Sequence, residues 1–473
     1  MRLSRALLPT TDTTDQAEAA STQERVLDRA AELFWRKGYA ATTTREIAAS
    51  LGIRQASLYH HVASKENLLH QLCVTSLEQL LQEVQSAVSE ANNPESRIGI
   101  LVHAHLNTLL KYRTRHALML TELRALSGTR RRQVLALRKR YEKLVLSVLE
   151  REQSIGSVRA EIPAKYLCLA LLNILNWAIL WFRDDDALSV HQLAEIFART
   201  YMQGAATSEG SLSMVFPHLR PNSRNPAPRR RKPPRASRKA ASTLLDTAAA
   251  LFAKKGYDLT STREIAAEVG INKASLYYHI ETKEDLLYDI CKSALTKIRE
   301  DVEAALRDVS NPLKRTEILI RTHIESMLRD YDRHSAALTE MSCLSTQRLD
   351  EVTALRDAYE SLARSVLNDA QTAGALREDV PVKYLCLALL GLLNRVLVWF
   401  RPNGPLSPDQ IGVLFAKIYL TGAAADPDSW RPRDAASSSA TFPMAYSAPI
   451  TSENAERAPA KRRRKLQYDR AGA

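Results

Sequence analysis

Apolar residues recur at helical spacing through most of the chain, and glycines or short polar stretches interrupt the pattern. The first helix is predicted to end at Gly38 and Tyr39. Its apolar face consists of Leu27, Ala30, Ala31, Leu33 and Phe34. Thr43, followed three residues later by Glu46, is a capping-box pattern that predicts a second, short helix ending at Gly52. Because strand-like alternation is rare, the pattern predicts an all-α fold.

A third helix follows Gly52, and its inward face is predicted to hold Ala56, Leu58 and Val62. Two short helices joined at a glycine turn, with the small residue Ala48 where they cross, are typical of a helix-turn-helix. The outer face of the second helix in such a motif fits the major groove of DNA, where side chains read the base edges.

The whole pattern occurs twice, at a fixed offset of 218 positions. Residues 26–69 and 244–287 are identical at 27 of 44 positions, and Pro163 likewise meets Pro381. Each copy has the size of a domain rather than of a solenoid repeat. The same spacing throughout means that both copies keep the same helix and loop lengths.

The repeat divides the chain into two units, each with a head and a body. The expected boundaries are a disordered arm (1–20), head one (21–69), body one (70–206), a basic Pro-rich linker (207–239), head two (240–287), body two (288–424) and a disordered basic tail (425–473). The linker and the tail contain too few apolar residues to form a core.

The net charge of +13 is concentrated in the linker and the tail. Residues 217–240 hold nine Arg or Lys and no acid, and residues 456–470 hold seven against two acids. The rest of the chain therefore sums to 13 − 9 − 5, or −1, so the net charge does not by itself indicate DNA binding. The basic runs at 229–232 and 461–465 either add phosphate contacts or touch nothing.

Five cysteines without a CxxC pair argue against a disulfide framework, and a reducing cytoplasm is expected. The N-terminus lacks the apolar segment of a signal peptide. Residues 166–182 and 384–400 are apolar over 17 positions each, the lower limit for a membrane span. Polar residues in the middle of both runs favour buried bundle helices over spans.

The outward positions of the two predicted helix-turn-helix motifs carry side chains that can donate or accept hydrogen bonds. In head one these residues are Thr44, Arg45, Arg54, Gln55, Ser57, Tyr59, His60, His61 and Lys65. In head two they are Thr262, Arg263, Asn272, Lys273, Ser275, Tyr277, Tyr278, His279 and Lys283. The residues at the helix starts suit phosphates, whereas those on the outer faces suit base edges. We therefore expect both sets to contact double-stranded DNA.

The stretches TTTREIAASLGIRQASLYHHVASKENLL and TSTREIAAEVGINKASLYYHIETKEDLL resemble the N-terminal signature of the tetracycline-repressor (TetR/AcrR) family. The resemblance covers about 50 residues of each unit closely, and the remainder agrees in length and helix order. It implies a helical subunit whose last two helices form a dimer interface. It also implies a repressor that a small molecule releases from its operator. The fusion of two units departs from the usual homodimer.

We therefore expect unit one to pack on unit two within the chain as a pseudo-dimer, with Asn176 and Trp177 facing Asn394 and Arg395. The two heads differ at base-reading positions, so an imperfect palindrome is expected. An effector-independent architectural DNA-binding protein is the alternative function, and a small-molecule screen distinguishes the two.

The body of each unit carries recurring polar residues that can orient an effector in a pocket. These candidates are His105, Glu122 and Tyr141 in unit one, and His323, Glu340 and Tyr359 in unit two. The alternative for each histidine is an ordinary hydrogen-bonded core residue. The resemblance suggests a hydrophobic or acyl-CoA-like effector. The sequence contains no pattern for a metal site, a cofactor or a catalytic nucleophile, so an enzyme is not expected.

Overall fold

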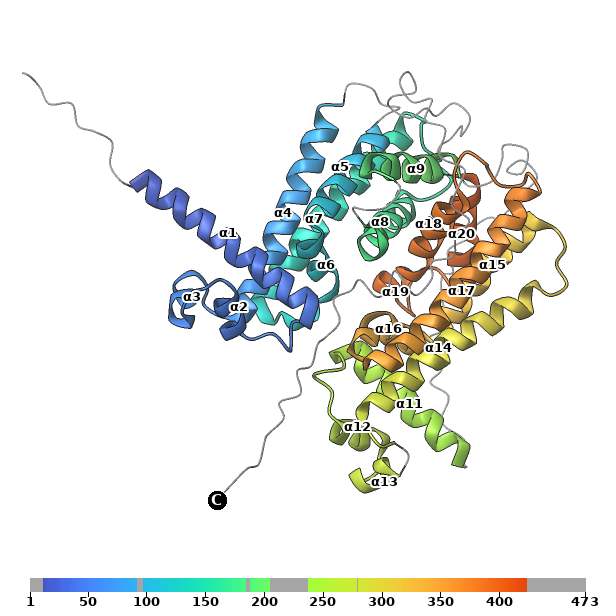
Figure 1. The fold of residues 1–473 in the computed structure, drawn as a ribbon. Helices are drawn as coiled ribbons and strands as arrows, with labels where there is room; N and C mark the ends of the chain where they lie inside the picture. Colours follow the sequence, from blue (N-terminus) through green and yellow to red (C-terminus); the bar gives the residue numbers. More distant parts are fainter. Residues whose placement is uncertain (1–11, 92–96, 184–187, 205–236, 279, 423–473) are drawn as a thin grey trace, which may run out of the picture.

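The computed structural model describes residues 12–91, 97–183, 188–204, 237–278 and 280–422, and these residues form helices and turns without a strand (Figure 1). Unit one contains α1 (Asp12–Lys37), α2 (Thr44–Ser50), α3 (Gln55–His61), α4 (Lys65–Ser89), α5 (Arg97–Lys111), α6 (Arg113–Thr121), the 3-10 turn η2 (Leu123–Ala125), α7 (Gly128–Ser154), α8 (Ala164–Trp181) and α9 (Val190–Gln203). Unit two contains α11 (Ser237–Lys255), α12 (Thr262–Val269), α13 (Lys273–Tyr277), α14 (Lys283–Leu306), α15 (Pro312–Arg329), α16 (Tyr331–Glu340), η3 (Met341–Cys343), α17 (Thr346–Thr372), α18 (Val382–Asn394), α19 (Val396–Trp399) and α20 (Pro408–Thr421). The all-α fold expected from the sequence is confirmed.

Two helix starts differ from the expected boundaries. Helix α1 begins at Asp12, inside the segment expected to be a disordered arm, because residues 12–25 are rich in the helix formers Ala, Glu and Gln. Helix α11 begins at Ser237, three positions before the expected start of head two. Residues 1–11, most of the linker and the tail lie outside the described residues, and so do both basic runs.

Each head has a small apolar core of its own, whereas the two bodies share one. The core of head one continues into the body through buried residues such as Leu118 and Val134, and the core of head two does so through Ala336 and Val352. A third and larger core contains residues of both bodies. Because one apolar core spans both bodies, neither body buries its apolar surface alone.

The shared core lies where α8 and α9 of unit one meet α18 and α20 of unit two. This arrangement confirms the expected packing of unit one on unit two. Two ion pairs at the edge repeat under the offset of 218: Arg199 with Asp379 at 2.6 Å, and Lys417 with Glu161 at 3.1 Å. The interface is therefore close to two-fold symmetric at its rim.

The backbones of the two units come closest at the ends of α9 and α20. A Cβ at Gly204 would lie 2.3 Å from the Leu420 carbonyl oxygen, and a Cβ at Gly422 would lie 2.1 Å from that of Met202. Only glycine fits such an approach, and both glycines also have positive φ angles of 79° and 74°.

Symmetry is lost at the centre of the interface. Trp177 of α8 packs on Gly391 of α18, where an added Cβ would lie 2.7 Å from the Trp177 Cβ. The reciprocal position is Asn173, whose Nδ2 donates to the Leu392 carbonyl at 3.0 Å. Helix α8 is continuous, whereas its counterpart is interrupted at Arg395 between α18 and α19.

Helix α8 and the segment Val382–Trp399 are long and apolar enough to cross a membrane by length and composition. In this structure they pack against each other, with 61% and 72% of their residues buried inside the protein. Mutual burial of this kind agrees with the bundle-helix interpretation, because lipid-facing helices leave one side uncovered.

Candidate nucleic-acid interface and effector cavity

The apolar core of head one supports α2 and α3 from one side. Ile47, Ala48 and Leu58 are buried as expected. Ala56, expected to face inward, is exposed. The chain turns between the helices at Gly52, whose φ of 70° is a left-handed conformation that glycine adopts without strain. The opposite side of α3 is left to solvent.

Side-chain hydrogen bonds fix the start of the second helix in each head. Thr43 accepts from the Glu46 N–H, and the Glu46 carboxylate accepts from the Thr43 N–H at 2.9 Å, so the predicted capping box is present. In head two, Ser261 accepts from the Glu264 N–H, but the Glu264 carboxylate pairs with Lys255 and the box is half formed.

Thr44 connects the start of α2 to the outer face of α3. Its hydroxyl lies 3.2 Å from that of Tyr59 and accepts a hydrogen bond from Gln55 Nε2 at 3.1 Å. In head two, the hydroxyls of Thr262 and Tyr277 lie 3.3 Å apart. These contacts join predicted phosphate and base contacts into one polar surface in each head.

The predicted DNA contacts of both heads are largely exposed. In head one the exposed side chains are Arg45, Arg54, Gln55, Tyr59 and His60, while Thr44 and Ser57 are half-buried. In head two they are Arg263, Asn272, Ser275, Tyr277 and Tyr278, while Thr262 is half-buried. Tyr278 is 88% exposed, a high value for an aromatic side chain. The side chains of His61 and Lys273, and all of His279, lie outside the described residues.

The residue just before α3 in head one and before α13 in head two, a predicted DNA contact, differs between the heads. Asn272 Oδ1 accepts from the Ser275 N–H at 2.7 Å and so caps α13. Its counterpart, Arg54, makes no such cap on α3. The Asn272 carbonyl oxygen is therefore already used, whereas the exposed Arg54 guanidinium has no acceptor atom and cannot cap a helix in this way.

Lys65 and Lys283, both predicted DNA contacts, bond to their own heads. Lys65 Nζ donates to the carbonyls of Tyr39, Ala40 and Thr42 at 2.9, 3.2 and 3.0 Å, which uses all three N–H groups of the ammonium. Lys283 Nζ donates to two equivalent carbonyls, at 2.7 and 3.0 Å. The bonds of Lys65 leave no donor for a phosphate, so its role in the structure is to close the turn before α2.

The histidines and tyrosines predicted to line an effector pocket form two buried pairs. His105 Nδ1 lies 2.6 Å from the Tyr141 hydroxyl, and His323 Nδ1 lies 2.6 Å from that of Tyr359. Burial lowers the pKa of each histidine to about 3, so both rings are neutral at physiological pH. The geometry agrees with the alternative of a hydrogen-bonded core histidine.

Glu122 and Glu340 do not join these pairs, because they lie where the heads meet the bodies. The Glu340 carboxylate accepts from the Tyr257 N–H at 2.9 Å and pairs with Arg124 of the other unit. Arg124 also donates to the Phe252 carbonyl, at the end of α11. Glu122 is nearby, and burial raises its pKa. Glu340 is therefore placed to hold the second head, and neither acid lines the two cavities described below.

A cavity of about 100 Å³ lies beside α8, and residues of both units line it. Tyr141 lines it, so the surface of one predicted pair does reach a cavity. Most of the other lining residues did not stand out in the sequence: Leu77, Leu80, Met119, Leu120, Arg138, Glu142, Leu169, Leu172, Asn173, Val398 and Trp399. Asn176 and Arg395, which the sequence did predict to meet, also line it.

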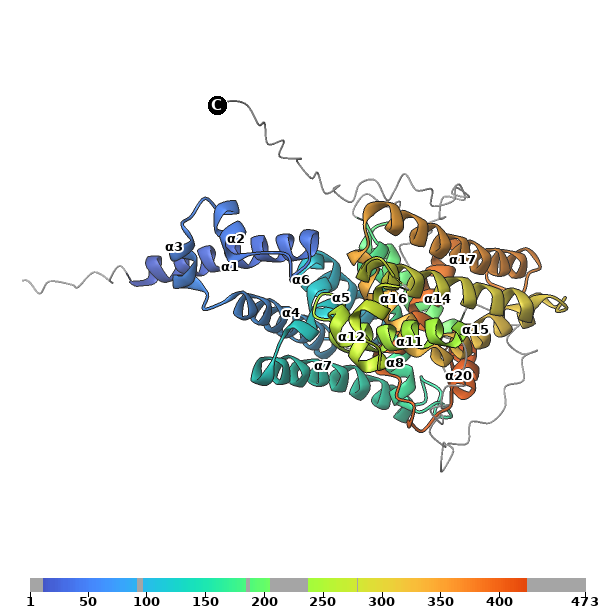
Figure 2. The same cartoon turned by 90° about the horizontal axis from the view of Figure 1, so that it is seen from below.

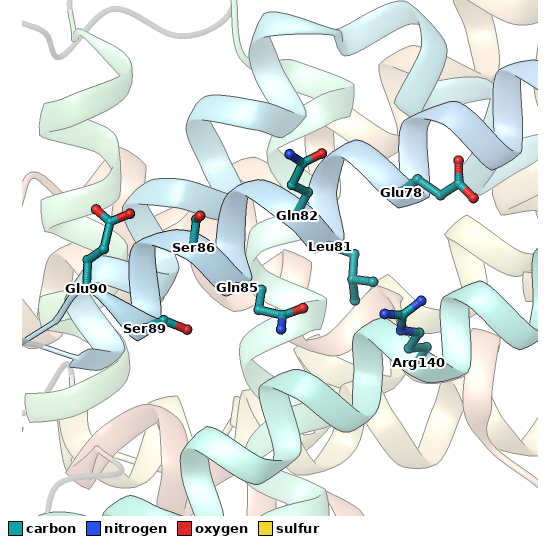
Figure 3. A pocket seen from close by; sticks show the side chains of 8 residues that line it. All are labelled: Glu78, Leu81, Gln82, Gln85, Ser86, Ser89, Glu90 and Arg140. Carbon is teal, nitrogen blue, oxygen red and sulfur yellow. The ribbon is translucent and has the colours of Figure 1, made fainter.

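A larger groove of about 450 Å³ is open to solvent between α4 and α7 (Figure 3). Its walls are polar: Figure 3 shows Glu78, Gln85 and Glu90 along α4, with Arg140 on α7 beside Leu81. All of its lining residues except Leu81 are polar, so the groove suits a hydrophobic effector less well than the cavity. Among the described residues, no group of three or more His, Cys, Asp or Glu side chains is arranged to hold a metal ion.

Comparison with known proteins decides the family. A model of the bacterial regulatory proteins of the tetR family matches residues 26–72 and 244–290, and a model of the tetracyclin repressor-like C-terminal domain matches residues 91–205 and 309–423. The chain belongs to the TetR family. It carries two complete TetR units in tandem, each with a DNA-binding head, and TetR proteins are regulators rather than enzymes.

Individual relatives match one unit of the pair. The transcriptional repressor KstR2 of Mycobacterium tuberculosis (strain ATCC 25618 / H37Rv) is 27% identical over 38% of this chain and 90% of its own length. The fatty acid metabolism regulator protein of Bacillus subtilis (strain 168) is 18% identical over 34% of this chain and 82% of its own length. The crystal structure of AibR with isovaleryl coenzyme A and operator DNA is 28% identical and covers 39% of this chain and 99% of its own, with a TM-score of 0.36.

Proposed function

We propose that this TetR-family protein is a transcriptional repressor that binds one pseudo-palindromic operator with two non-identical heads and leaves it when a small hydrophobic effector binds. The observation that carries the proposal is the pairing of the units through a shared core. In Figure 1, α2–α3 lie at the left and α12–α13 at the bottom, both on the side of the molecule away from α9 and α20. The repressor KstR2, which matches one unit, supports the direction of regulation. Double-stranded operator DNA lies in the cytoplasm, where we expect the protein to act.

In this proposal the polar surfaces of α2, α3, α12 and α13 contact the DNA. Arg45 and Arg263 bind phosphates, while Gln55, Tyr59 and Tyr277 face the major groove. His61, Lys273 and His279 belong to the same faces by sequence. The heads differ where Arg54 and His60 become Asn272 and Tyr278. Because such side chains select bases, the two half-sites should differ.

Selection of bound DNA from random sequence tests the operator. We expect an inverted repeat with unequal halves. Exchanging Arg54-Gln55 with Asn272-Lys273 between the heads should invert the order of the halves, since a bidentate base contact discriminates by about 1–3 kcal/mol. A perfectly symmetric site that ignores the exchange would contradict two non-identical heads.

Arg45→Ala and Arg263→Ala serve as the matched pair for phosphate contacts. Each should weaken binding to all sequences equally and reduce the salt dependence by about one counterion. If neither variant changes the affinity for DNA, the protein does not bind DNA through these faces.

A fluorescence screen with labelled operator DNA then tests release. We expect apolar metabolites of the acyl class to dissociate the complex, in keeping with the apolar walls of the cavity and with the fatty acid metabolism regulator among the relatives. If no small molecule stabilises the protein or releases the DNA, the effector-independent architectural role is favoured.

A further inference from the structure

The cavity beside α8 holds two cationic side chains from different units. Arg138 comes from α7 of unit one, and Arg395 comes from the break between α18 and α19 of unit two. Among the described residues neither guanidinium forms a hydrogen bond or an ion pair, and the acid Glu142 on the cavity wall is farther than ion-pair distance from both. The two side chains are half-buried, and the charge of Arg138 acts unfavourably on that of Arg395, so the cavity favours an anion between them.

The electrostatics of the two arginines agree with this geometry. Burial, and after it the charge of Arg138, lowers the pKa of Arg395 to about 9. Burial also lowers the pKa of Arg138, and Glu142 opposes that change. The formal charges of the two arginines and of Glu142 sum to +1, which suits a monoanion better than a phosphate dianion.

The rest of the lining is largely apolar, with further polar groups on Tyr141, Asn173, Asn176 and Trp399. Leu77, Met119 and Leu172 contribute aliphatic walls, and Asn176 faces the cavity. Trp399 Nε1 is buried and has no partner among the described residues. The cavity is open on one side, so its volume of about 100 Å³ accommodates a carboxylate and the first carbons of a short chain, and the rest of the chain extends out past the exposed Val398.

We infer that this cavity binds one carboxylate with a short apolar chain, held through its oxygens by Arg138 and Arg395 together. A carboxylate is planar and accepts paired N–H donors, which is the geometry that guanidinium groups present. The inference rests on the proposed function, because it names the class of effector and the place where it binds.

Unit two does not repeat this site. The counterpart of Arg138 is Arg356, which is 54% exposed and bonds to Asp357 at 3.2 Å. The counterpart of Arg395 is Trp177, which covers Gly391. The chain should therefore bind one anion, although it contains two units.

Isothermal titration of the full chain without DNA tests the inference, with hexanoate as the probe and hexanamide as its neutral match. We expect one hexanoate per chain and at least tenfold weaker binding of hexanamide. Arg395→Gln and Arg138→Gln should each weaken hexanoate binding at least tenfold. Arg395→Lys should retain part of the affinity, and Arg356→Gln, the matched control, should retain all of it.

Several outcomes overturn the inference: no binding of hexanoate, two sites per chain, equal affinity for hexanamide, or an equal loss in Arg356→Gln. If Arg395→Gln does not fold, Arg138→Gln decides. The operator assay separates this failure from that of the proposed function. Release of the operator by another molecule, without hexanoate binding, overturns the cavity alone. Binding of hexanoate at Arg395 without any effect on operator affinity overturns release by this effector and leaves the cavity intact.

Discussion

Unit one and unit two agree closely in their heads and differ most in how their bodies bury charge. In unit one, Arg97 Nη1 pairs with Glu152 at 2.7 Å, and both side chains are at most 6% exposed. In unit two, Ala370 replaces the acid, and Arg315 donates instead to the carbonyls of Leu306 and Val309, each at 3.0 Å. The same backbone position therefore accommodates an arginine paired with a carboxylate in unit one and an arginine bonded to backbone carbonyls in unit two. Glycine turns and helix caps recur in both units. A charged partner can be replaced between the units if the arginine still finds acceptors for its N–H groups.

The largest expected effect distinguishes the Arg97–Glu152 pair from the hydrogen bonds of Arg315. Arg97→Ala leaves the Glu152 carboxylate buried without its cation and should cost about 3–5 kcal/mol of stability. Arg315→Ala removes two hydrogen bonds to carbonyls and should cost about 1–3 kcal/mol. Urea denaturation of each variant measures the difference.

The double variant Arg97→Ala/Glu152→Ala provides the control for the buried pair. It should be far more stable than Arg97→Ala alone, because no isolated charge remains. If Arg97→Ala and Arg315→Ala lower the free energy of unfolding equally, the two arrangements contribute the same stability and the expected difference between the units is contradicted.

A smaller effect is expected at the centre of the interface, where Trp177 packs on Gly391 but Asn173 occupies the reciprocal position. Gly391→Leu should cost about 1–3 kcal/mol, because its Cβ would lie 2.7 Å from the Trp177 Cβ and also 3.0 and 3.1 Å from the ring atoms Cγ and Cδ1, which Trp177→Ala removes. Adding Trp177→Ala should recover part of that loss. Denaturation midpoints of the two single variants and the double variant test this coupling; simple additivity would show that the two residues do not compete for space.

The smallest effect concerns acid stability and should be equal in both units. His105 and His323 have pKa values lowered to about 3 by burial, below the value of about 6.5 in an unfolded chain. Their contribution is complete above pH 6.5 and is lost as the pH falls from 6.5 toward 3, since only the unfolded state takes up the protons. His105→Gln or His323→Gln should flatten this fall by up to about 1.4 kcal/mol per pH unit. Unchanged slopes in denaturation series from pH 4.5 to 7 would contradict neutral buried rings.

Local sequence features allowed the heads to be predicted, because their structure depends on short-range chemistry. Gly52 and Gly270 mark turns with positive φ, Thr43 and Ser261 cap helices, and the constant offset of 218 excludes different loop lengths. The exposed reading surfaces follow from that placement. The roles of individual polar groups within it, such as the three carbonyls that occupy Lys65, depend on tertiary distances that spacing does not encode.

The effector cavity was only partly predictable. Asn176 and Arg395 were expected to meet, and both line it, but Arg138 is indistinguishable in the sequence from the exposed arginines around it on α7. Glu122 and Glu340 recur at equivalent positions like the pocket candidates, yet they lie under the heads. Recurrence between the units identifies residues that the fold uses. It does not identify which side of a helix faces a cavity.

The single apolar core that spans both bodies separates two tasks of the polypeptide. The linker makes each unit meet the other unit of the same chain, whereas the apolar surface buried between the units determines how long they stay together. Cleavage between the halves would thus produce two fragments that remain one particle, and the nick would become visible only once a denaturant dissolved the core.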